Sequence, residues 1–446
     1  MTRWLYSILM WLVQPFVRRK LARRGLHESG YLQAVQERFG YYTVAPLNGQ
    51  DNTIWIHAVS LGETRAAAVL LTLLRESMPG MRLLLTHGTA TGRAEGAALL
   101  RAADIQTWQP WDTSGAVRRF LTHFKPRMGI LMETEIWPNL VAACAKMQVP
   151  LVLANARLSE KSLRQARRLA WLSRPAYGDL CAIWAQTGAD AQRLQQLGAK
   201  VQGVYGNLKF DATPNAQQLA EGRAWRRSFG RPVVMFASSR AGEEEALLHI
   251  LALHRSTVGR HNTSVGAAAK AYGIQWLIVP RHPQRFDEVA ALIAHHGFAV
   301  RRRADWVETP LAGEDLDEDA IWLGDTLGEM ALYYGLADVA LLGGSFEPLG
   351  GQNLIEAAAC ACPLVMGPHT FNFADAADLA EAAGAALRVS SLQQAFNVAR
   401  SLATDPVQHA AMSSAAAKFS TAHRGAVEKT VAAVVALLGQ QGVDAL

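Results

Sequence analysis

The sequence predicts an α/β protein made of two tandem, doubly wound, Rossmann-like domains, each built on a parallel sheet. Two observations predict this class. Short, continuous apolar runs alternate with helical stretches from residue 53 to residue 366, which is typical of parallel strands covered by helices on both faces. The alternation pauses at 211–215 (DATPN), where Pro214 and polar turn-forming residues indicate a linker.

The elements follow in order. The first series has five candidate strands, separated by helical stretches such as Thr64–Ser77 and Leu140–Met147: Thr53–Val59, Met81–Thr86, Met128–Met132, Leu151–Ala154 and Cys181–Ala185. The second series has six: Val233–Ala237, Trp276–Val279, Phe298–Val300, Ala320–Leu323, Val339–Leu342 and Leu364–Met366. Residues 254–273 predict an exposed loop, and the tail 392–438 has helical periodicity. We therefore expect an N-terminal domain at 31–211 and a C-terminal domain at 216–446.

Residues 1–30 differ from the rest of the chain in charge. They contain six Lys or Arg side chains and a single acidic residue, Glu28, which gives a net charge of +5. The whole chain has a net charge of +6, so the remaining residues sum to about +1. This balance argues against nucleic acid as a partner. The apolar run Trp4–Val17 is shorter than the roughly 20 residues of a spanning helix. An interfacial anchor, a short signal-anchor and a packed helix remain open, and we favour membrane attachment.

The cysteines do not form a metal motif. Cys360 and Cys362 lie in one apolar run, and Cys144 and Cys181 do not supply a second pair at zinc-ligand spacing. We expect reduced thiols, and neither a metal nor a cofactor.

Candidate catalytic residues follow strands of the first domain. In HAVSLGE (57–63), Glu63 lies where a strand ends and a helix begins, which suits a general base. The alternative is a helix-start residue whose pKa the helix dipole lowers. In METEIWPN (132–139), Glu133 and Glu135 would share one face if the strand continues. In GNLKFD (206–211), Lys209 is either a cation facing an interdomain cleft or a solvated linker lysine.

Loops of the second domain carry a second group of candidates. ASSRAGEEE (237–245) offers Ser239 and Arg240, and VPRHPQRF (279–286) offers Arg281 and His282 between two prolines. An arginine there suits a phosphate or a base carbonyl. GDTLGEM (324–330) adds three residues that open a helix: Leu327, Gly328 and Glu329.

A glycine-rich segment, 343–373, follows the strand Val339–Leu342. Its two glycine pairs, the second being Gly350–Gly351, allow a ligand close to the backbone, and the following helix start suits a phosphate. Asn353 and Glu356 are compatible with a capping box, with a contact to a ribose diol, or with both.

The stretch 161–175 (KSLRQARRLAWLSRP) interleaves arginines with Leu163, Leu169 and Trp171. A basic helix with an aromatic side chain can bind a membrane or an anionic lipid headgroup, or it can be a solvated face. Its acceptor-binding candidates are Arg164, Arg167 and Arg168.

Taken together, these motifs resemble the Kdo transferase family, whose members add 3-deoxy-D-manno-octulosonic acid (Kdo) to a lipid A precursor. The resemblance rests on HAVSLGE, METEIWPN, GNLKFD, SSRAGEE (238–244), PRHPQRF (280–286), GDTLGE (324–329), GGSFEPLGGQNLIE (343–356) and GPHTFNF (367–373). They run in the family's order over most of the chain. Gln352 departs from the family, which usually has histidine there.

The resemblance implies a GT-B fold with a cleft between its domains, an inverting, metal-independent transfer from CMP-Kdo to lipid IVA, and a place on the cytoplasmic face of the bacterial inner membrane. It implies that Glu63 is the base and that Glu133 and Lys209 stabilise the transition state. Ser60 and Gly62 would lie near the acceptor. The implied CMP-Kdo contacts are Ser239, Arg240, Arg281, His282, Leu327 to Glu329, Gly350, Gly351, Asn353, Leu354, Ile355 and Glu356.

Two rival functions remain open. Another GT-B enzyme, a UDP-sugar transferase or a sugar-nucleotide 2-epimerase, would share the fold. A catalytically silent, membrane-associated scaffold would share the fold without the chemistry, although intact candidates at 63, 209, 281 and 356 argue against it. The number of Kdo residues transferred, the oligomeric state and the effect of Gln352 cannot be deduced from the sequence.

Overall fold

The chain divides into two units, each with its own parallel sheet. The computed structural model describes residues 2–49, 52–261, 273–306 and 320–444. The first unit comprises 1–211 and 423–446, and the second comprises 212–422. The chain therefore passes between the units twice.

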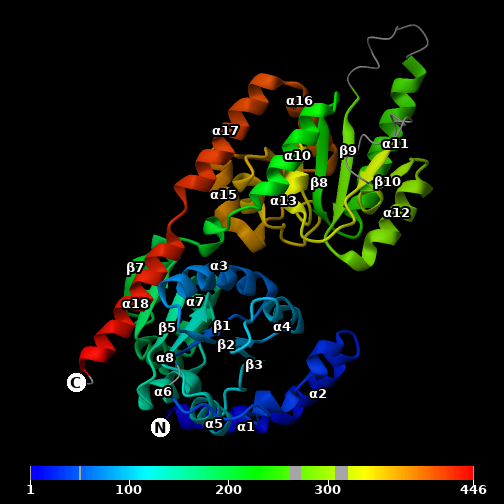
Figure 1. Ribbon diagram of the computed structural model, residues 1–446. Helices are drawn as coiled ribbons and strands as arrows, with labels where there is room; N and C mark the ends of the chain where they lie inside the picture. The colour runs from blue at the N-terminus through cyan, green and yellow to red at the C-terminus, as the bar shows by residue number, and fades with distance from the viewer. Residues whose placement is uncertain (1, 50–51, 262–272, 307–319, 445–446) are drawn as a thin grey trace. The chain divides into compact units, whose positions relative to one another are not determined.

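The first unit is built on a seven-stranded parallel sheet in the order β3-β2-β1-β4-β5-β6-β7 (Figure 1). Its strands are β1 (Thr53–His57), β2 (Arg82–His87), β3 (Ile105–Trp108), β4 (Met128–Met132), β5 (Leu151–Ala156), β6 (Ala182–Ala185) and β7 (Val201–Val204). The chain winds outward in one direction from β1 and in the other from β4. A switch of this kind leaves a crevice at the carboxyl ends of the two central strands, where open α/β sheets bind ligands.

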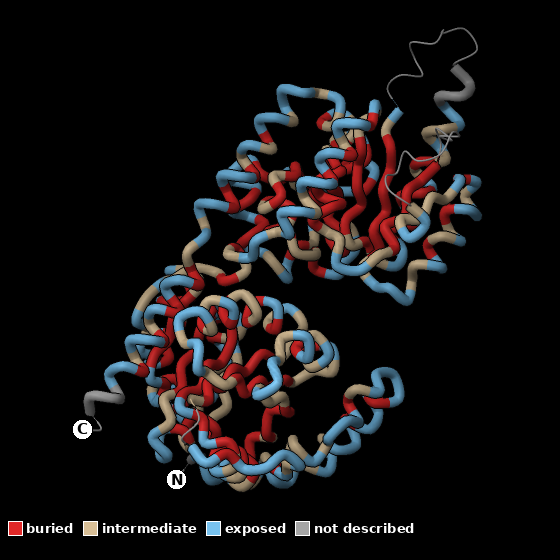
Figure 2. Tube along the Cα trace, viewed as in Figure 1, coloured by how far each residue is buried: buried red, intermediate tan, exposed pale blue. Residues whose placement is uncertain are grey.

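The central strands are apolar on both faces because helices cover both sides of the sheet. Every residue of β1 and β4 is buried. One face packs around Trp55 and Phe120, and the other around Ile56, Leu70 and Leu74. Figure 2 shows the buried strands as the red interior of the unit. This continuous burial confirms the parallel-sheet prediction.

Helices of the first unit begin at side-chain caps just beyond the strands. Ser60, Thr89, Thr113, Ser159 and Thr187 each accept a hydrogen bond from the backbone of the next helix, which satisfies an N–H group that would otherwise lack a partner. The helices that they start are α3 (Leu61–Ser77), α4 (Ala90–Ala97), α5 (Ser114–Phe124), α7 (Glu160–Arg168) and α9 (Gly188–Gln195). Helices α6 (Pro138–Lys146) and α8 (Ala170–Gly178) start without such a cap.

The second unit repeats this plan with the order β10-β11-β9-β8-β12-β13-β14. Its strands are β8 (Val233–Ser239), β9 (Gln275–Pro280), β10 (Val300–Arg302), β11 (Ile321–Leu323), β12 (Val339–Leu342), β13 (Leu364–Met366) and β14 (Ala386–Arg388). Its helices are α10 (Ala216–Ser228), α11 (Glu243–His261), α12 (Phe286–His295), α13 (Met330–Leu336), α14 (Leu354–Ala359), α15 (Ala374–Ala382), α16 (Leu392–Thr404) and α17 (Pro406–Ala422). In this sheet the point at which the strand order reverses lies between β8 and β12.

Two expectations need correction. The second domain does not extend to residue 446, because α18 (Ala426–Asp444) packs beside α3 and places Val427, Val431 and Val434 in the first unit's core (Figure 1). Residues 254–261 are not a loop, since α11 continues through them. The rest of that predicted loop lies largely outside the described residues.

The N-terminal segment forms two helices, α1 (Thr2–Leu12) and α2 (Gln14–Gly25), which belong to the first unit. Within the described residues, no helix is both long and apolar enough to cross a bilayer. The inner side of α1 is polar: Tyr6 donates to Asp112 at 2.8 Å and Ser7 to Asn139 at 2.9 Å. Its outer side exposes Trp4 and Trp11, each about two-thirds accessible.

Candidate functional site

Three carboxylates gather at the switch point of the first unit, beyond β1 and β4. Glu63 stands in the first turn of α3, and Glu133 and Glu135 follow β4. The negative charges of Glu133 and Glu135 both act on Glu63. The structure thus brings together the sequence-predicted acidic residues of the first domain. They come from different segments of the chain and share one crevice edge.

Burial dominates the chemistry of Glu63. Burial, with a smaller contribution from the neighbouring charges of Glu133 and Glu135, raises the pKa of Glu63 to about 7. The backbone N–H of Val59, which donates to Oε2 at 2.8 Å, acts in the opposite direction. The expected lowering by the helix dipole is therefore outweighed. A carboxylate with a pKa near neutrality is well suited to take up and release a proton.

Glu63 also has the structural role that the sequence left open. The Ser60 hydroxyl accepts from the Glu63 N–H and lies 3.2 Å from Oε1, and Oε2 binds the preceding turn at Val59. This reciprocal pattern is a variant of the capping box. Capping and proton transfer are compatible, because the cap fixes the carboxylate at the crevice edge. Gly62, beside it, is exposed, and a Cβ there would meet no other atom within 4 Å.

Glu133 is held in an unusual backbone conformation. Its φ is +57°, a left-handed value that costs a non-glycine residue about 1–3 kcal/mol. The strand ends at Met132, as its predicted range has it, so the condition for Glu133 and Glu135 to share a strand face is not met. A turn directs the buried carboxylate of Glu133 to two cations. Lys209 Nζ lies 2.9 Å from Oε1, and Arg157 Nε lies 3.3 Å from Oε2. Lys209 is therefore bound to the acidic cluster and is not a solvated linker lysine.

Glu135 has a partner that the sequence reasoning did not single out as a candidate. Its Oε2 accepts from the indole of Trp137 at 2.9 Å and lies 3.8 Å from Nε2 of His57. His57 is fully buried at the end of β1, and its Nδ1 lies 2.9 Å from the Thr86 hydroxyl. The signal was available, because His57 opens HAVSLGE and Glu135 lies within METEIWPN.

The basic candidates of α7 lie on a different part of the first unit. Arg164 and Arg168 are exposed, and Arg167 donates to Gln196. Helix α7 packs against α8 and α9, and α1 packs against α8. Among the described residues, no hydrogen bond or ion pair joins these arginines to the three carboxylates, and α8 is the helix that both α7 and α1 contact.

In the second unit, cationic side chains converge beyond β8 and β9. The pKa of His282 is lowered, first by burial and then by the charges of Arg240, Arg281 and Arg285. Three guanidinium groups around one imidazole leave this edge of the sheet strongly electropositive, which favours an anionic ligand. The sequence analysis predicted Arg240, Arg281 and His282 as site residues, but not Arg285.

Ser239 is not free to contact a ligand as expected. It is fully buried, and its hydroxyl donates to Glu244 at 2.9 Å. Glu244, also fully buried, receives Arg285 at 2.8 Å. Ser239 therefore acts on the cationic edge indirectly, by orienting the carboxylate that holds Arg285.

The glycine-rich segment differs from expectation in its first half. The buried carboxylate of Glu243 accepts from the N–H groups of Gly344 at 2.8 Å, Phe346 at 3.2 Å and Arg240 at 3.0 Å. A side chain of the protein itself thus fills the loop where a phosphate was anticipated. The Gln352 amide lies beside Gly344, whose φ is +71°.

The second half of this segment remains at the site. Gly350 and Gly351 have φ of +89° and +74°, and a Cβ on Gly350 would lie 2.5 Å from Asn372 and Phe371. Asn353 caps α14 by accepting from Ile355 at 3.2 Å, and Leu354 and Ile355 are buried. These two side chains therefore pack in the core, so a ligand can meet only their backbone.

Glu356 and Arg281 both lie within electrostatic reach of one buried tyrosine. The opposite charges of both side chains act on the buried Tyr334. Two candidates that are 75 positions apart in the sequence therefore flank one aromatic residue.

The loop 327–329 is only partly available. Glu329 is paired with Arg303 at 2.9 Å and also receives the Thr326 hydroxyl. Leu327 is largely exposed, and the carbonyl of Gly328 accepts from Gln218 at 3.0 Å. Among the described residues, no group of three or more His, Cys, Asp or Glu side chains is arranged to hold a metal ion.

Two parallel-sheet α/β units with sites at their switch points define the architecture of GT-B glycosyltransferases. A solved glycosyltransferase from Rickettsia africae matches 88% of this chain and 98% of its own, at 11% identity and a TM-score of 0.53. A UDP-GlcNAc 2-epimerase from Neisseria meningitidis matches 86% of this chain and 99% of its own, at 13% identity and a TM-score of 0.54. These likenesses show the fold alone, and it is common to transferases and epimerases.

Sequence comparison decides between them. The 3-deoxy-D-manno-octulosonic-acid transferase (Kdo transferase) family matches residues 33–212. A 3-deoxy-D-manno-octulosonic acid transferase of Bordetella pertussis is 44% identical over 98% of this chain and all of its own length. The chain belongs to the Kdo transferase family and is a glycosyltransferase.

Proposed function

We propose that the protein transfers Kdo from CMP-Kdo to a hydroxyl of the lipid A precursor lipid IVA, with inversion, for lipopolysaccharide biosynthesis. The acceptor oxygen forms a bond to the anomeric carbon, and the bond from that carbon to the CMP phosphate oxygen breaks. The acceptor proton passes to Glu63, and CMP leaves. The observation that carries this proposal is the Glu63 carboxylate, fixed by Val59 and Ser60 at the switch point of the first unit, with a pKa raised by burial.

Glu133 and Lys209 supply the supporting electrostatics. Their 2.9 Å ion pair is rigid because it is mostly buried and further bound by Arg157. A fixed pair beside the base stabilises charge in the transition state without reorganising at the moment of reaction. Arg157 contributes by sharing the Glu133 carboxylate.

The donor is held by the cationic edge of the second unit. Arg240, Arg281 and His282 offer hydrogen-bond donors to the phosphate of CMP and to the Kdo carboxylate. Gly350 and Gly351 allow the nucleotide close to the backbone, and Glu356 binds the ribose diol. A nucleoside monophosphate carries less charge than a diphosphate, and we propose that these side chains neutralise it without a metal ion.

The lipid acceptor is reached from the cytoplasmic face of the inner membrane. The outer side of α1 places two tryptophans beside Leu5 and Leu9, all more than half exposed, while its inner side is bonded to the protein. Exposed Leu169 and Trp171 lie next to Arg164 and Arg168 on α7 and α8. Such a basic, aromatic surface suits the interface of an anionic bilayer, and the arginines suit the phosphates of lipid IVA.

The test is transfer by purified protein from CMP-Kdo to lipid IVA in mixed micelles, with the product identified by mass spectrometry and its anomeric configuration by NMR. We expect a Kdo-lipid product with inverted configuration and one CMP released for each Kdo added. Transfer or epimerisation of a UDP-sugar, with none from CMP-Kdo, would overturn the proposal. Mass spectrometry also counts the Kdo residues.

A further inference from the structure

Lys209 is carried by a very short element. It lies in the 3₁₀ turn η3 (Leu208–Asp211), the last part of the first unit before the chain leaves it. A single turn has little stability of its own. The turn must therefore be held by the rest of the unit: Leu208 and Phe210 are buried in it, and hydrogen bonds fix both ends of η3.

The N-terminal end of η3 is fixed by two asparagines. The Leu208 N–H donates to Oδ1 of Asn155 at 3.1 Å, and the Lys209 N–H donates to Oδ1 of Asn207 at 3.0 Å. Asn155 belongs to β5, so this end is bound directly to the sheet.

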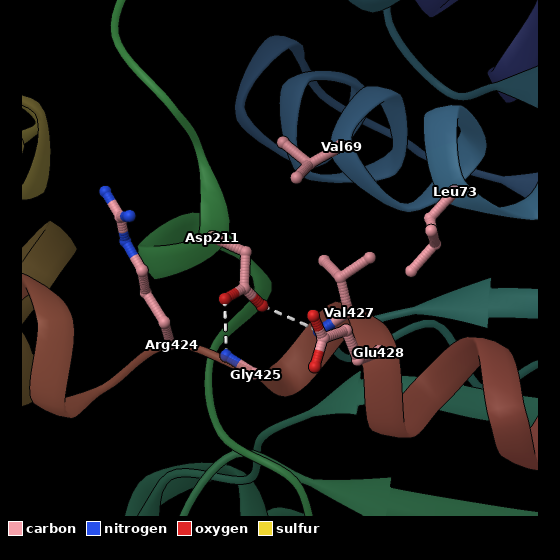
Figure 3. Close-up of a pocket in the computed structure, with 7 residues that line it drawn as sticks. All are labelled: Val69, Leu73, Asp211, Arg424, Gly425, Val427 and Glu428. Carbon is pink, nitrogen blue, oxygen red and sulfur yellow. Dashed lines mark hydrogen bonds between the residues drawn. The ribbon is translucent and has the colours of Figure 1, made fainter.

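The C-terminal end is fixed by the carboxylate of Asp211. Its Oδ1 accepts from the Gly425 N–H at 2.6 Å and its Oδ2 from the Val427 N–H at 2.7 Å (Figure 3). The carboxylate thereby caps α18, the helix with which the chain returns to the first unit, where a negative charge is favoured. One side chain thus joins the outgoing and returning segments.

The junction has an open side next to Asp211, whereas Leu208 and Phe210 in the same turn are buried. A cavity of about 460 Å³ borders Asp211, lined by α3 and the start of α18 (Figure 3). Phe210 is buried and stacks on His423 with ring centroids 4.9 Å apart. At the Asp211 end of η3, the two hydrogen bonds to the backbone of α18 therefore add to the packing of Leu208 and Phe210.

We propose that Asp211 is a positioning residue: by clasping the start of α18, it holds η3 so that Lys209 stays paired with Glu133. This rests on the proposed role of Lys209 in transfer. Asp211 itself touches neither substrate nor the reacting atoms.

The first test reads the geometry without any substrate. Competitive acetylation of full-length protein, followed by mass spectrometry, reports how accessible each lysine amine is. Asp211→Ala should raise the labelling rate of Lys209 several-fold, whereas exposed Lys161 should label as before. The matched control is Asp405→Ala, which removes a carboxylate that caps α17 by accepting from Val407 and Gln408 at 3.0 Å each. An unchanged Lys209 rate in Asp211→Ala would overturn the proposal whatever the substrate is.

The second test is a kinetic double-mutant cycle. Asp211→Ala should lower kcat about 10- to 100-fold, the scale of an ångström-sized misplacement, with the KM for CMP-Kdo unchanged. Asp211→Asn, which keeps one acceptor oxygen, should lose less. In a Lys209→Met background, Asp211→Ala should cost no further activity, because both changes remove the same ion pair.

The outcomes separate the two proposals. If the Asp211 and Lys209 losses multiply in the double variant, Asp211 does not act through Lys209 and the inference fails while the proposed function stands. If Lys209→Met keeps full activity, the role of Lys209 in transfer fails, and the labelling result alone decides whether Asp211 positions it. Equal kcat losses in Asp211→Ala and Asp405→Ala would show a general loss of stability and would also overturn the inference.

Discussion

The ammonium of Lys209 lies 2.9 Å from Oε1 of Glu133, a residue held at a left-handed φ of +57°. The two come from strand-end segments that are 76 positions apart in the sequence, and neither would bind the other without the turn after β4. Strain of this kind persists only where surrounding contacts determine it. The backbone conformation of the turn after β4 therefore determines where the charges of Glu133 and Lys209 lie relative to Glu63.

Glu63→Gln removes the proton acceptor while preserving size and one oxygen that can accept from Val59. We expect kcat to fall by a factor on the order of 10² to 10⁴, as for loss of a general base, with little change in the affinity for CMP. Initial rates of CMP release measure the effect. Glu95→Gln, which alters an exposed partner of Arg65, is the control and should retain activity. Equal rates for both variants would exclude Glu63 as the base.

The pH profile should have its acidic limb near pH 7. Glu63 must be ionised to accept a proton, so activity rises as pH passes upward through its pKa of about 7. Lys209→Met should move this limb to higher pH, because the uncompensated charge of Glu133 raises the pKa of Glu63 further. Plots of kcat/KM against pH report the shift. A limb that remains in place would show that Lys209 does not offset Glu133 at the base.

Stability should fall with rising pH because of Glu63. Its pKa is about 7 in the folded protein and 4.5 as a free side chain, so between these values the folded state binds the extra proton and unfolding releases it. The stabilisation is complete below pH 4.5 and is lost as pH rises to 7. Thermal melts of Glu63→Gln and of the parent protein should be compared at pH 5 and at pH 8. The Tm of Glu63→Gln minus that of the parent should be larger at pH 8 than at pH 5. A pH-independent difference would contradict the raised pKa.

Arg281→Ala should weaken CMP binding about tenfold or more, the usual cost of a charge-assisted hydrogen bond. Calorimetry with CMP at low and at physiological salt measures the loss. Arg227→Ala, on the exposed face of α10, is a charge-matched control. If both variants bind CMP alike, the cationic edge beyond β8 and β9 is not the nucleotide site.

Replacing Trp4 and Trp11 together by serine should reduce binding to vesicles that contain anionic phospholipid, because aromatic side chains anchor a helix at the interface. Flotation with and without added salt measures the bound fraction. Val407→Ser removes an exposed apolar side chain from the second unit and should leave flotation unchanged. Parent-level flotation of the double variant would exclude α1 as the contact surface.

The hydrophobic pattern of the sequence predicted the central strands of each sheet well and the edge strands poorly. The bounds of β4, β12 and β13 match the predicted ranges, because central parallel strands are buried on both faces and appear as continuous apolar runs. The edge strands β3, β7 and β14 were missed. Each of these strands is only three or four residues long and includes a polar or small side chain, so it does not form a continuous apolar run. Edge strands are commonly short and carry polar residues, because one of their sides has no neighbouring strand.

The site residues Glu63, Glu133 and Arg281 could be predicted because each one follows the carboxyl end of a strand that is recognisable in the sequence. The site was less predictable where distant residues compete for the same backbone groups. Glu243, which lies about 100 residues earlier in the sequence, accepts hydrogen bonds from the N–H groups of Gly344 and Phe346. The glycine pattern alone could not show that these N–H groups already have a partner.

The discontinuity of the first unit has a consequence for biosynthesis. Val427, Val431, Val434 and Leu438 belong to the same core as Ile56 and Leu70, yet the ribosome makes them only after all of 212–422. The nascent first unit must therefore wait with the part of this core that α18 covers, including one side of α3, exposed while the second unit is synthesised. Exposed apolar surface of this kind is what chaperones bind. We expect the interval before α18 emerges to be when the polypeptide is most prone to aggregate.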